Sequence, residues 1–514
     1  MMSKRSGFGS TGGWRSFAWG LLSIVLVVAF AGAAVLLGPP PAWVDGASGS
    51  TARTNIVSRR DVLAFCPARM SLSESDKIGD EQFRASEGDL KSAARYTAFG
   101  PVFASKVDPL SGGNPLVLGD QDPLDGEQVM VAGGDVDQGA TIQTTSLLKA
   151  EPGAGSAASI ASWATKGDMT GVQALTCPGA AMTSSFLLPA TKRGWTQKLM
   201  AYNPSSKPTV VTVTLWGSKE AGRIASGTHS SVTLEPGGQS QLDVAAAAPG
   251  QDAVFMVVSS SQAPVATAVC AQAMDGLKPL GSDYVSTASE PSKQAVIPGL
   301  RATDKTTLIV YGNKASTVKA YWLGDDGRQE AAEAKIMSGQ VTLPDLGQAP
   351  KGTRALQVES DDPVRVAAWV RRDGEGGQAD FSVIQAQPLL PVTQGPSSVI
   401  PLPGAVSSEL TLVNAEGGEA GARLTAFDDQ GKKLAQKDLE VKEGTALAVS
   451  MDDLSDGAAA ITLGVTRGRL AWNARLGSRD VDRASAAGLA HIAPGSLRPS
   501  TLAVLSGPVE GMIR

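Results

Sequence analysis

The sequence predicts an all-β protein, with an N-terminal transmembrane helix followed by about four tandem immunoglobulin-like antiparallel β-sandwich units. First, an uncharged apolar run occupies residues 17–38. Second, the rest of the chain alternates apolar and polar residues in short runs bounded by Gly, Asn and Asp, which is typical of strands and hairpins. Third, this pattern recurs at a spacing of roughly 100 residues, which is the usual length of one sandwich.

The apolar run is long enough to cross a membrane. As a helix, residues 17–38 would extend about 33 Å, against a hydrocarbon core of about 30 Å. Lys4, Arg5 and Arg15 precede it without an acidic residue, which places the N-terminus in the cytoplasm. A cleaved secretory signal is the alternative, but its apolar region is usually only about 7–15 residues. We therefore expect a single-pass signal-anchor in the cell membrane, with the bulk of the chain extracytoplasmic.

Three later stretches repeat one another, namely "QKLMAYNPSSKPTVVTVTLWG", "TTLIVYGNKASTVKAYWLG" and "SELTLVNAEGGEAGARLTAF". Each holds two alternating runs around a polar turn near Asn203, Asn313 or Asn414. A propeller is the alternative architecture, but its blades are typically about 40–50 residues long. The expected division is a cytoplasmic tail (1–16), the anchor (17–38), a linker (39–60), a divergent first β unit (61–180), three β-sandwich units (181–292, 293–392 and 393–496) and a C-terminal tail (497–514).

The first of these units has the weakest pattern. Its final segment, "GSAASIASWATKGDMTGVQALTC" at 155–177, resembles the hairpins that close the later units, such as "TRALQVESDDPVRVAAWV" at 353–370. This resemblance is the reason for expecting a unit ahead of residue 181. Within it, the polar stretch at 80–96, "DEQFRASEGDLKSAARY", is expected to be a short helix or a loop.

Cys66, Cys177 and Cys270 are the three cysteines. Cys66 and Cys177 stand in similar settings, "CPARM" and "CPGAAM", near the expected start and end of the first unit. An oxidising compartment would let two of them pair. The pattern favours a Cys66–Cys177 bridge, while a Cys177–Cys270 bridge and three free thiols remain open.

No catalytic motif is recognisable. The sequence has no Gly-x-Ser-x-Gly elbow and no phosphate-binding Gly-x-x-x-x-Gly-Lys-Ser/Thr loop. His229 and His491, the two histidines, lie far apart in the sequence. Each is expected to be a surface or hydrogen-bonded histidine rather than a general base. We therefore expect a non-enzymatic protein without a cofactor. The net charge of −5 argues against a nucleic-acid partner, whose binding surface would be basic.

One acidic cluster could bind a metal ion. Asp120, Asp122 and Asp125 precede Gly126 and resemble a calcium loop, because Ca²⁺ prefers several oxygen ligands. The spacing departs from the calcium-binding pattern by one residue, and Pro123 stiffens the segment. A solvated loop is the alternative interpretation.

Tryptophans are the candidates for binding sugar. Most of them occupy strand positions and are expected in the core. Trp195 follows Arg193 and Gly194 in a loop-like stretch, so it is the candidate for an exposed glycan-binding platform.

The ordered set "LTCPGAAM", "GWTQKLMAYNPSSKPTVVTVTLWG", "LEPGGQSQLDV" and "AMDGLKPLGSDYVSTASEPSKQAVIPG" resembles an actinobacterial family of membrane-anchored extracytoplasmic proteins catalogued as a domain of unknown function. The resemblance covers most of the chain after the anchor. Members are often encoded beside a large membrane glycosyltransferase. The resemblance implies a β-rich repeat architecture at the cell envelope and brings no catalytic residues.

These observations together predict a scaffold or accessory protein for a membrane-bound cell-envelope machinery. The expected partner is an integral membrane protein, and the resemblance points to a glycosyltransferase. The alternative is a module that binds envelope polysaccharide, with Trp195 as its first candidate residue.

Overall fold

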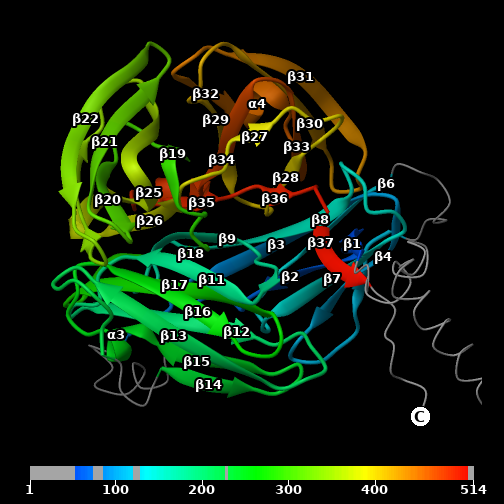
Figure 1. Cartoon of the computed structure of the whole chain (residues 1–514), viewed down its shortest axis with the longest axis horizontal. Helices are drawn as coiled ribbons and strands as arrows, with labels where there is room; N and C mark the ends of the chain where they lie inside the picture. The colour runs from blue at the N-terminus through cyan, green and yellow to red at the C-terminus, as the bar shows by residue number, and fades with distance from the viewer. Residues whose placement is uncertain (1–52, 73–84, 120–127, 226–229, 500, 507–514) are drawn as a thin grey trace, which may run out of the picture. The chain divides into compact units, whose positions relative to one another are not determined.

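The computed structural model of the protein describes residues 53–72, 85–119, 128–225, 230–499 and 501–506 (Figure 1). The chain divides into two compact parts. Residues 58–500 form the larger part, which we call the body. In the smaller part, β1 (Arg53–Ser58) pairs with β37 (Thr501–Ser506). The expected anchor at 17–38 lies outside the described residues. Among the residues described, no helix is long and apolar enough to cross a membrane.

The body repeats one pattern of antiparallel strand pairing four times. Numbered in chain order within a repeat, the first, sixth, third and fourth strands form one sheet, and the fifth, second, seventh and eighth strands form the other. In the first unit these sheets are β2-β7-β4-β5 and β6-β3-β8-β9. The strands are β2 (Asp61–Cys66), β3 (Lys91–Gly100), β4 (Val102–Pro109), β5 (Leu116–Val117), β6 (Gln128–Gly134), β7 (Thr141–Leu147), β8 (Gly155–Ala164) and β9 (Gly171–Thr176).

The second unit repeats this order in β11-β16-β13-β14 and β15-β12-β17-β18, with the short β10 added beside β17. Its strands are β10 (Ala180–Ala181), β11 (Thr183–Leu188), β12 (Trp195–Tyr202), β13 (Thr209–Gly217), β14 (Ser231–Leu234), β15 (Gln239–Asp243), β16 (Val254–Ser260), β17 (Val265–Asp275) and β18 (Lys278–Val285). The one-turn helix α3 (Val244–Ala247) follows β15 and is capped by the Asp243 carboxylate.

The third unit joins its two sheets through one long strand. Strand β25 (Thr353–Asp373) pairs with β19 and β21 along its first part and with β20 and β26 along its second part. It therefore serves as both the sixth and the seventh strand of the repeat. The other strands are β19 (Ser292–Pro298), β20 (Lys305–Gly312), β21 (Ser316–Gly324), β22 (Gly327–Ile336), β23 (Val341–Thr342), β24 (Asp345–Gln348) and β26 (Ala379–Gln385).

The fourth unit has the sheets β28-β33-β30-β31 and β32-β29-β34-β35, with β36 and β27 added beside β28 and β34. Its strands are β27 (Leu390–Pro391), β28 (Ser398–Pro401), β29 (Ser407–Asn414), β30 (Ala420–Phe427), β31 (Lys433–Val441), β32 (Thr445–Ser450), β33 (Ala460–Arg467), β34 (Arg469–Gly477), β35 (Ala490–Ile492) and β36 (Gly495–Ser496). Helix α4 (Met451–Leu454) follows β32 as α3 follows β15.

In the second and fourth units, an asparagine stabilises the turn that joins the second strand to the third. Asn203 donates through Nδ2 to the carbonyls of Lys207 and Leu234, and Asn414 donates to those of Gly418 and Val441. Each side chain therefore satisfies buried backbone acceptors where the chain leaves the sheet.

The pairing corrects two sequence expectations for the first unit. Segment 155–177 forms β8 and β9, which are the seventh and eighth strands, whereas the closing hairpins of later units are their sixth and seventh strands. Residues 91–96 of the polar stretch at 80–96 form the start of β3, a strand from Lys91 rather than a helix or loop. Small residues lie on both faces of β3, so buried and exposed positions do not alternate clearly along it. The sequence therefore lacks the alternation that predicts a strand.

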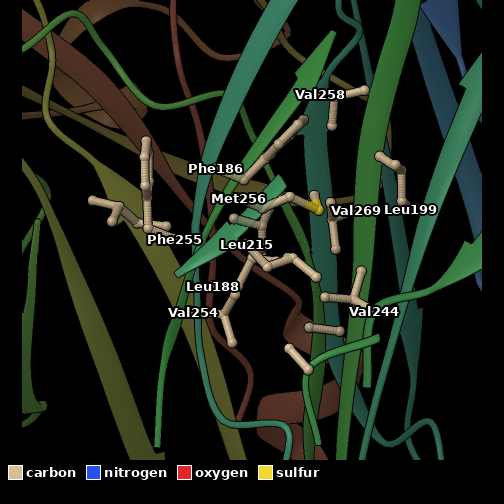
Figure 2. Packing of buried hydrophobic residues seen from close by; sticks show 14 of the residues in the cluster. Phe186, Leu188, Leu199, Leu215, Val244, Val254, Phe255, Met256, Val258 and Val269 are labelled. Atoms are coloured by element: carbon tan, nitrogen blue, oxygen red, sulfur yellow. The ribbon is translucent and has the colours of Figure 1, made fainter. Parts of the chain in front are cut away.

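The prediction of an all-β fold is confirmed. The second unit shows how its core forms, because inward residues from both sheets meet between them (Figure 2). Phe186, Leu215 and Met256 come from one sheet, and Leu199 and Val269 come from the other; all five are buried. Burying such side chains stabilises the fold by about 1.5–3 kcal/mol each.

Neighbouring units also share apolar contacts. Phe65 of the first unit stacks on Tyr202 of the second at 5.2 Å, and Phe255 of the second stacks on Tyr311 of the third at 4.0 Å. One buried cluster joins Val296 and Leu323 of the third unit to Val413 of the fourth. The units are therefore packed against one another rather than strung on free linkers.

Candidate functional site

The eighth strand of each repeat reaches the region where all four units meet. Strands β9, β18, β26 and β35 lie near one another in the middle of the body (Figure 1), and we call them the central strands. Gln173 of β9 donates through Nε2 to the Ser282 hydroxyl of β18 at 2.8 Å. The buried surfaces of these strands are unusually polar.

Asp380 of β26 is the principal link between units. Its Oδ2 accepts the backbone N–H groups of Val172 at 2.9 Å and Leu489 at 2.8 Å, and its Oδ1 accepts that of Phe381 at 3.0 Å. Val172 belongs to the first unit and Leu489 to the fourth. Burial raises the pKa of Asp380 well above its usual value, and the backbone donors oppose that rise.

Close approach of β18 to Asp380 requires a glycine. At Gly281, φ is 110°, and a Cβ there would lie 2.6 Å from the Asp380 Oδ1 atom. A side chain at this position would push the second unit away from the third.

Asp283 of β18 forms the second carboxyl group of the centre. Its Oδ1 accepts the backbone N–H groups of Ala174 at 3.1 Å and Tyr284 at 2.8 Å. Burial raises the pKa of Asp283 well above its usual value, and the nearby Asp380 charge adds to the rise. The carboxyl group thus joins the first and second units.

His491 of β35 joins the fourth unit to the third. Its Nδ1 lies 3.2 Å from the Ser382 hydroxyl, and its Nε2 lies 2.9 Å from the Gly299 carbonyl oxygen. Burial, and next the Arg475 charge, lower the pKa of His491 to about 3. The neutral ring must carry its proton on Nε2, because the Gly299 carbonyl can only accept, so Nδ1 accepts from Ser382.

A buried ion pair lies beside this histidine. Arg475 of β34 donates to both Asp304 oxygens, at 2.6 Å and 3.0 Å, and also to the Gly299 carbonyl at 3.1 Å. Only 3% of the Arg475 side chain and none of the Asp304 side chain is exposed. Burial alone would raise the pKa of Asp304, but the Arg475 charge lowers it. The pair again joins the third and fourth units.

This centre is built to hold the units together. The cavity beside His491 measures about 10 Å³, which is about the volume that one water centre occupies. Although Asp283, Ser382 and His491 are residue types used in nucleophilic catalysis, a substrate has no room beside them. We therefore assign these side chains to structure.

The histidine gives the stability of the body a defined dependence on pH. Because the pKa of His491 is about 3 when folded and about 6.5 when unfolded, the unfolded chain binds the proton more tightly, so stability is lost as pH falls below about 6.5. Asp283 and Asp380 have raised pKa values in the folded protein, so their contribution to stability increases as the pH falls.

A His491→Gln variant isolates this contribution, since glutamine can still donate to Gly299. We expect the wild type to lose about 2 kcal/mol relative to His491→Gln between pH 7.5 and pH 5, measured by urea unfolding at each pH. A difference between the two proteins that does not change with pH would contradict the assignment of a neutral, buried imidazole.

The second candidate site is a groove of about 670 Å³ between the second and third units. We call it the tryptophan groove. Trp195 and Trp369 contribute to its wall, with ring centroids 5.3 Å apart and rings nearly perpendicular, at 82°. Trp195 also lies 5.1 Å from the Phe381 ring. Both tryptophans are half-buried.

The turn before β12 fixes the position of Trp195. Gly194 has φ 87°, and its carbonyl accepts the backbone N–H of Met274 at 2.8 Å. A Cβ at Gly194 would lie 2.4 Å from the Met274 oxygen, so this turn needs glycine. The backbone N–H of Trp195 donates to the Lys192 carbonyl.

Polar groups border the two indoles. Lys192 forms an ion pair with Asp252, and Gln340 of the third unit donates to the Ser218 carbonyl of the second at 2.7 Å. Lys335 of β22 is exposed at the groove and has no acidic partner within 4.0 Å among the described residues. The groove therefore combines aromatic surface with donors and acceptors.

Sequence reasoning found only part of these sites. The sequence favours Trp195 as an exposed loop residue, whereas the structure places it half-buried as the first residue of β12. The strand pattern predicts Trp369 in the core, whereas the structure half-buries it beside Trp195. Trp322 and Trp472 are indeed buried. The two carboxyls of the centre were missed, although an acidic residue inside an otherwise apolar strand, as in "GSDYV" at 281–285, is a usable signal of a buried polar contact.

The candidate metal ligands Asp120, Asp122 and Asp125 lie outside the described residues, as does His229. Within the described ranges, no group of three or more His, Cys, Asp or Glu side chains is arranged to hold a metal ion.

The expected disulfide is present between Cys66 and Cys177, whose Cα atoms are 4.8 Å apart. It connects the end of β2 to the residue after β9, across a sequence separation of 111. Cys270 is a free thiol, and burial raises its pKa to about 12. The alternatives that paired Cys270 or left three thiols are excluded.

Removing this bridge is expected to destabilise the body. A Cys66→Ala, Cys177→Ala double variant should lose about 3 kcal/mol, because a long closed loop no longer restricts the unfolded chain. Urea unfolding of oxidised protein measures the loss, with Cys270→Ala as the control. Equal unfolding midpoints for the reduced and oxidised wild type would contradict the prediction.

Comparison with known proteins identifies a family. A model of DUF5719, a family of unknown function, matches residues 131–452. No curated protein matches the sequence. Among solved structures, the chain is similar to a glycosyl hydrolase family 2 member from Bacteroides cellulosilyticus, at 8% identity and a TM-score of 0.10, over 65% of this chain and 36% of that chain. The chain thus spans about a third of that structure, and a similarity so weak carries no argument. Because the family match covers more than half of the sequence, this chain belongs to DUF5719, a family of unknown function.

Proposed function

We propose that this protein is a non-enzymatic, membrane-anchored scaffold or accessory of a cell-envelope machinery. The observation that carries the proposal is the shared centre, where Asp380 accepts hydrogen bonds from two other units. A buried carboxyl group satisfied by three units holds them in one arrangement. Such a body presents its surfaces at fixed positions, as a scaffold requires.

Two further observations support the location. The uncharged run at 17–38 has the length and flanking charges of an anchor. The Cys66–Cys177 bridge suits an oxidising compartment outside the cytoplasm. Anchoring raises the effective concentration of the body for any partner in the same membrane without new contacts.

Unpaired sheet edges are the proposed docking surfaces. The fourth strands of the repeats, among them β22 and β31, each pair with one strand in the described part of the chain. An extended segment of a partner can add to such an edge through backbone hydrogen bonds. Strand β22 carries charges along its length, which discourages indiscriminate pairing and favours a matched partner. We propose an integral membrane protein as that partner, with a glycosyltransferase as the first class to examine.

Photo-crosslinking in native membranes tests the proposal. A photoreactive residue replaces Gln329, exposed on the β22 edge, in the full-length chain, and a matched control replaces Lys207, exposed in a turn of the second unit. We expect an integral membrane protein to crosslink at 329 and not at 207. Replacing residues 17–38 with a cleavable secretion signal should abolish the adduct. The same adducts at both positions, or no membrane protein at either, would contradict the scaffold.

A further inference from the structure

We infer that the tryptophan groove is a saccharide-binding site that needs both the second and the third unit. This inference does not depend on the scaffold function. It rests on the two indoles, on the polar groups around them, and on a volume that lies inside the range of about 300–1,000 Å³ common for ligand sites.

The aromatic part of the site is preorganised. Trp195 packs against Trp369 and Phe381, and the Gly194 turn fixes its backbone. A side chain that is already fixed loses little conformational entropy when a ligand binds. One face of a sugar ring presents C–H hydrogens, which are attracted to the electron-rich face of an indole.

The polar part of the site suits hydroxyl groups. Lys192 and Asp252 supply a donor and an acceptor from the second unit, and Gln340 supplies an amide from the third. Hydrogen bonds to charged groups are the stronger kind, so the Lys192–Asp252 pair can orient a sugar hydroxyl between opposite charges. Lys335, which lacks an acidic partner among the described residues, favours a saccharide that carries acid groups.

The same mixture argues against other ligands. A lipid chain would remove water from Lys335 and from the Lys192–Asp252 ion pair without offering a hydrogen bond, which costs free energy. Met337 is 61% exposed at the rim and is an adaptable apolar side chain that can cover the edge of a ring. A saccharide uses all of these features, because it offers apolar faces and hydroxyl edges on the same ring.

The groove is formed by two units together and not by one repeat alone. Trp195, Ser218 and Asp252 come from the second unit, whereas Met337, Gln340 and Trp369 come from the third. The Gln340–Ser218 hydrogen bond crosses between them. Contacts between the units therefore position the binding surface.

Affinity electrophoresis of the full-length protein in detergent tests the inference, so that loss of a membrane partner has no influence on the result. The probes in the gel are a neutral linear mannan, an arabinogalactan and the uronic-acid polymer polygalacturonate. We expect at least one probe to retard the wild type, and polygalacturonate to do so most strongly.

Matched variants locate the binding. Met337→Glu changes the groove, and Met182→Glu changes a methionine of similar exposure, 45%, outside it. We expect Met337→Glu to weaken binding about tenfold and Met182→Glu to leave it unchanged. Trp195→Ala should weaken binding to a similar degree. No retardation of the wild type by any probe would overturn the inference, as would equal effects of the two methionine variants.

Discussion

The Asp380→Asn variant is expected to have a free energy of unfolding about 3 kcal/mol lower than that of the wild type, because an amide cannot accept the three backbone hydrogen bonds that the carboxyl group accepts. Each oxygen of Asp380 already accepts an N–H group. Placing the amide nitrogen at either position sets one donor against another, and at least one buried N–H is left unpaired at a cost of about 1–3 kcal/mol.

The control for this substitution is Asp438→Asn. Asp438 is exposed and pairs with Arg423 on the surface of the fourth unit, so its loss is expected to change the free energy of unfolding far less than the loss of Asp380 does. Urea unfolding, followed by tryptophan fluorescence, measures both variants. Equal losses for the buried and the exposed aspartate would contradict the role given to the centre.

The second large effect is expected from Arg475→Met. This change leaves Arg372, at 3.3 Å, as the remaining ion-pair partner of the buried Asp304 carboxylate among the described residues, and should cost about 4 kcal/mol. The matched control is Arg423→Met, which removes an exposed arginine from Asp438 and should change the free energy of unfolding far less.

A double variant separates pairing from packing. Replacing the pair with apolar residues, as Arg475→Met with Asp304→Leu, should recover most of the stability lost by Arg475→Met alone, because the fully buried carboxylate is removed and the Arg372 side chain, 24% exposed, still reaches solvent. A double variant that is no more stable than the single one would show that the cost arises from packing and not from an uncompensated carboxylate.

The sequence predicts those features of the fold that depend on local residue patterns, such as individual strands. Alternation in "TVVTVTLWG" predicts a strand with one buried face, and the structure buries Val211, Val213 and Leu215 on that face of β13. The cysteine settings likewise identified the bridge. In the first unit, however, "KSAARYTAFG" has small residues on both faces, and its strand was missed.

The contacts between units could not be predicted in the same way. They depend on which residues of the eighth strands face one another after four repeats have folded, and sequence periodicity within one repeat carries no such information. Asp283 and Asp380 lie 97 positions apart, yet both contact β9. For the same reason, Trp195 could be recognised alone, whereas Trp369 becomes part of a groove only through contacts between the second and third units.

Native-state hydrogen exchange of the full-length protein, followed by mass spectrometry, most directly tests the central claim that the four units form one body. We predict that peptides from β9, β18, β26 and β35 share the highest protection and lose it together as the urea concentration is raised. Asp380→Asn should lower the protection of all four. Independent loss of protection in each unit, with the Asp380→Asn effect confined to β26, would contradict it.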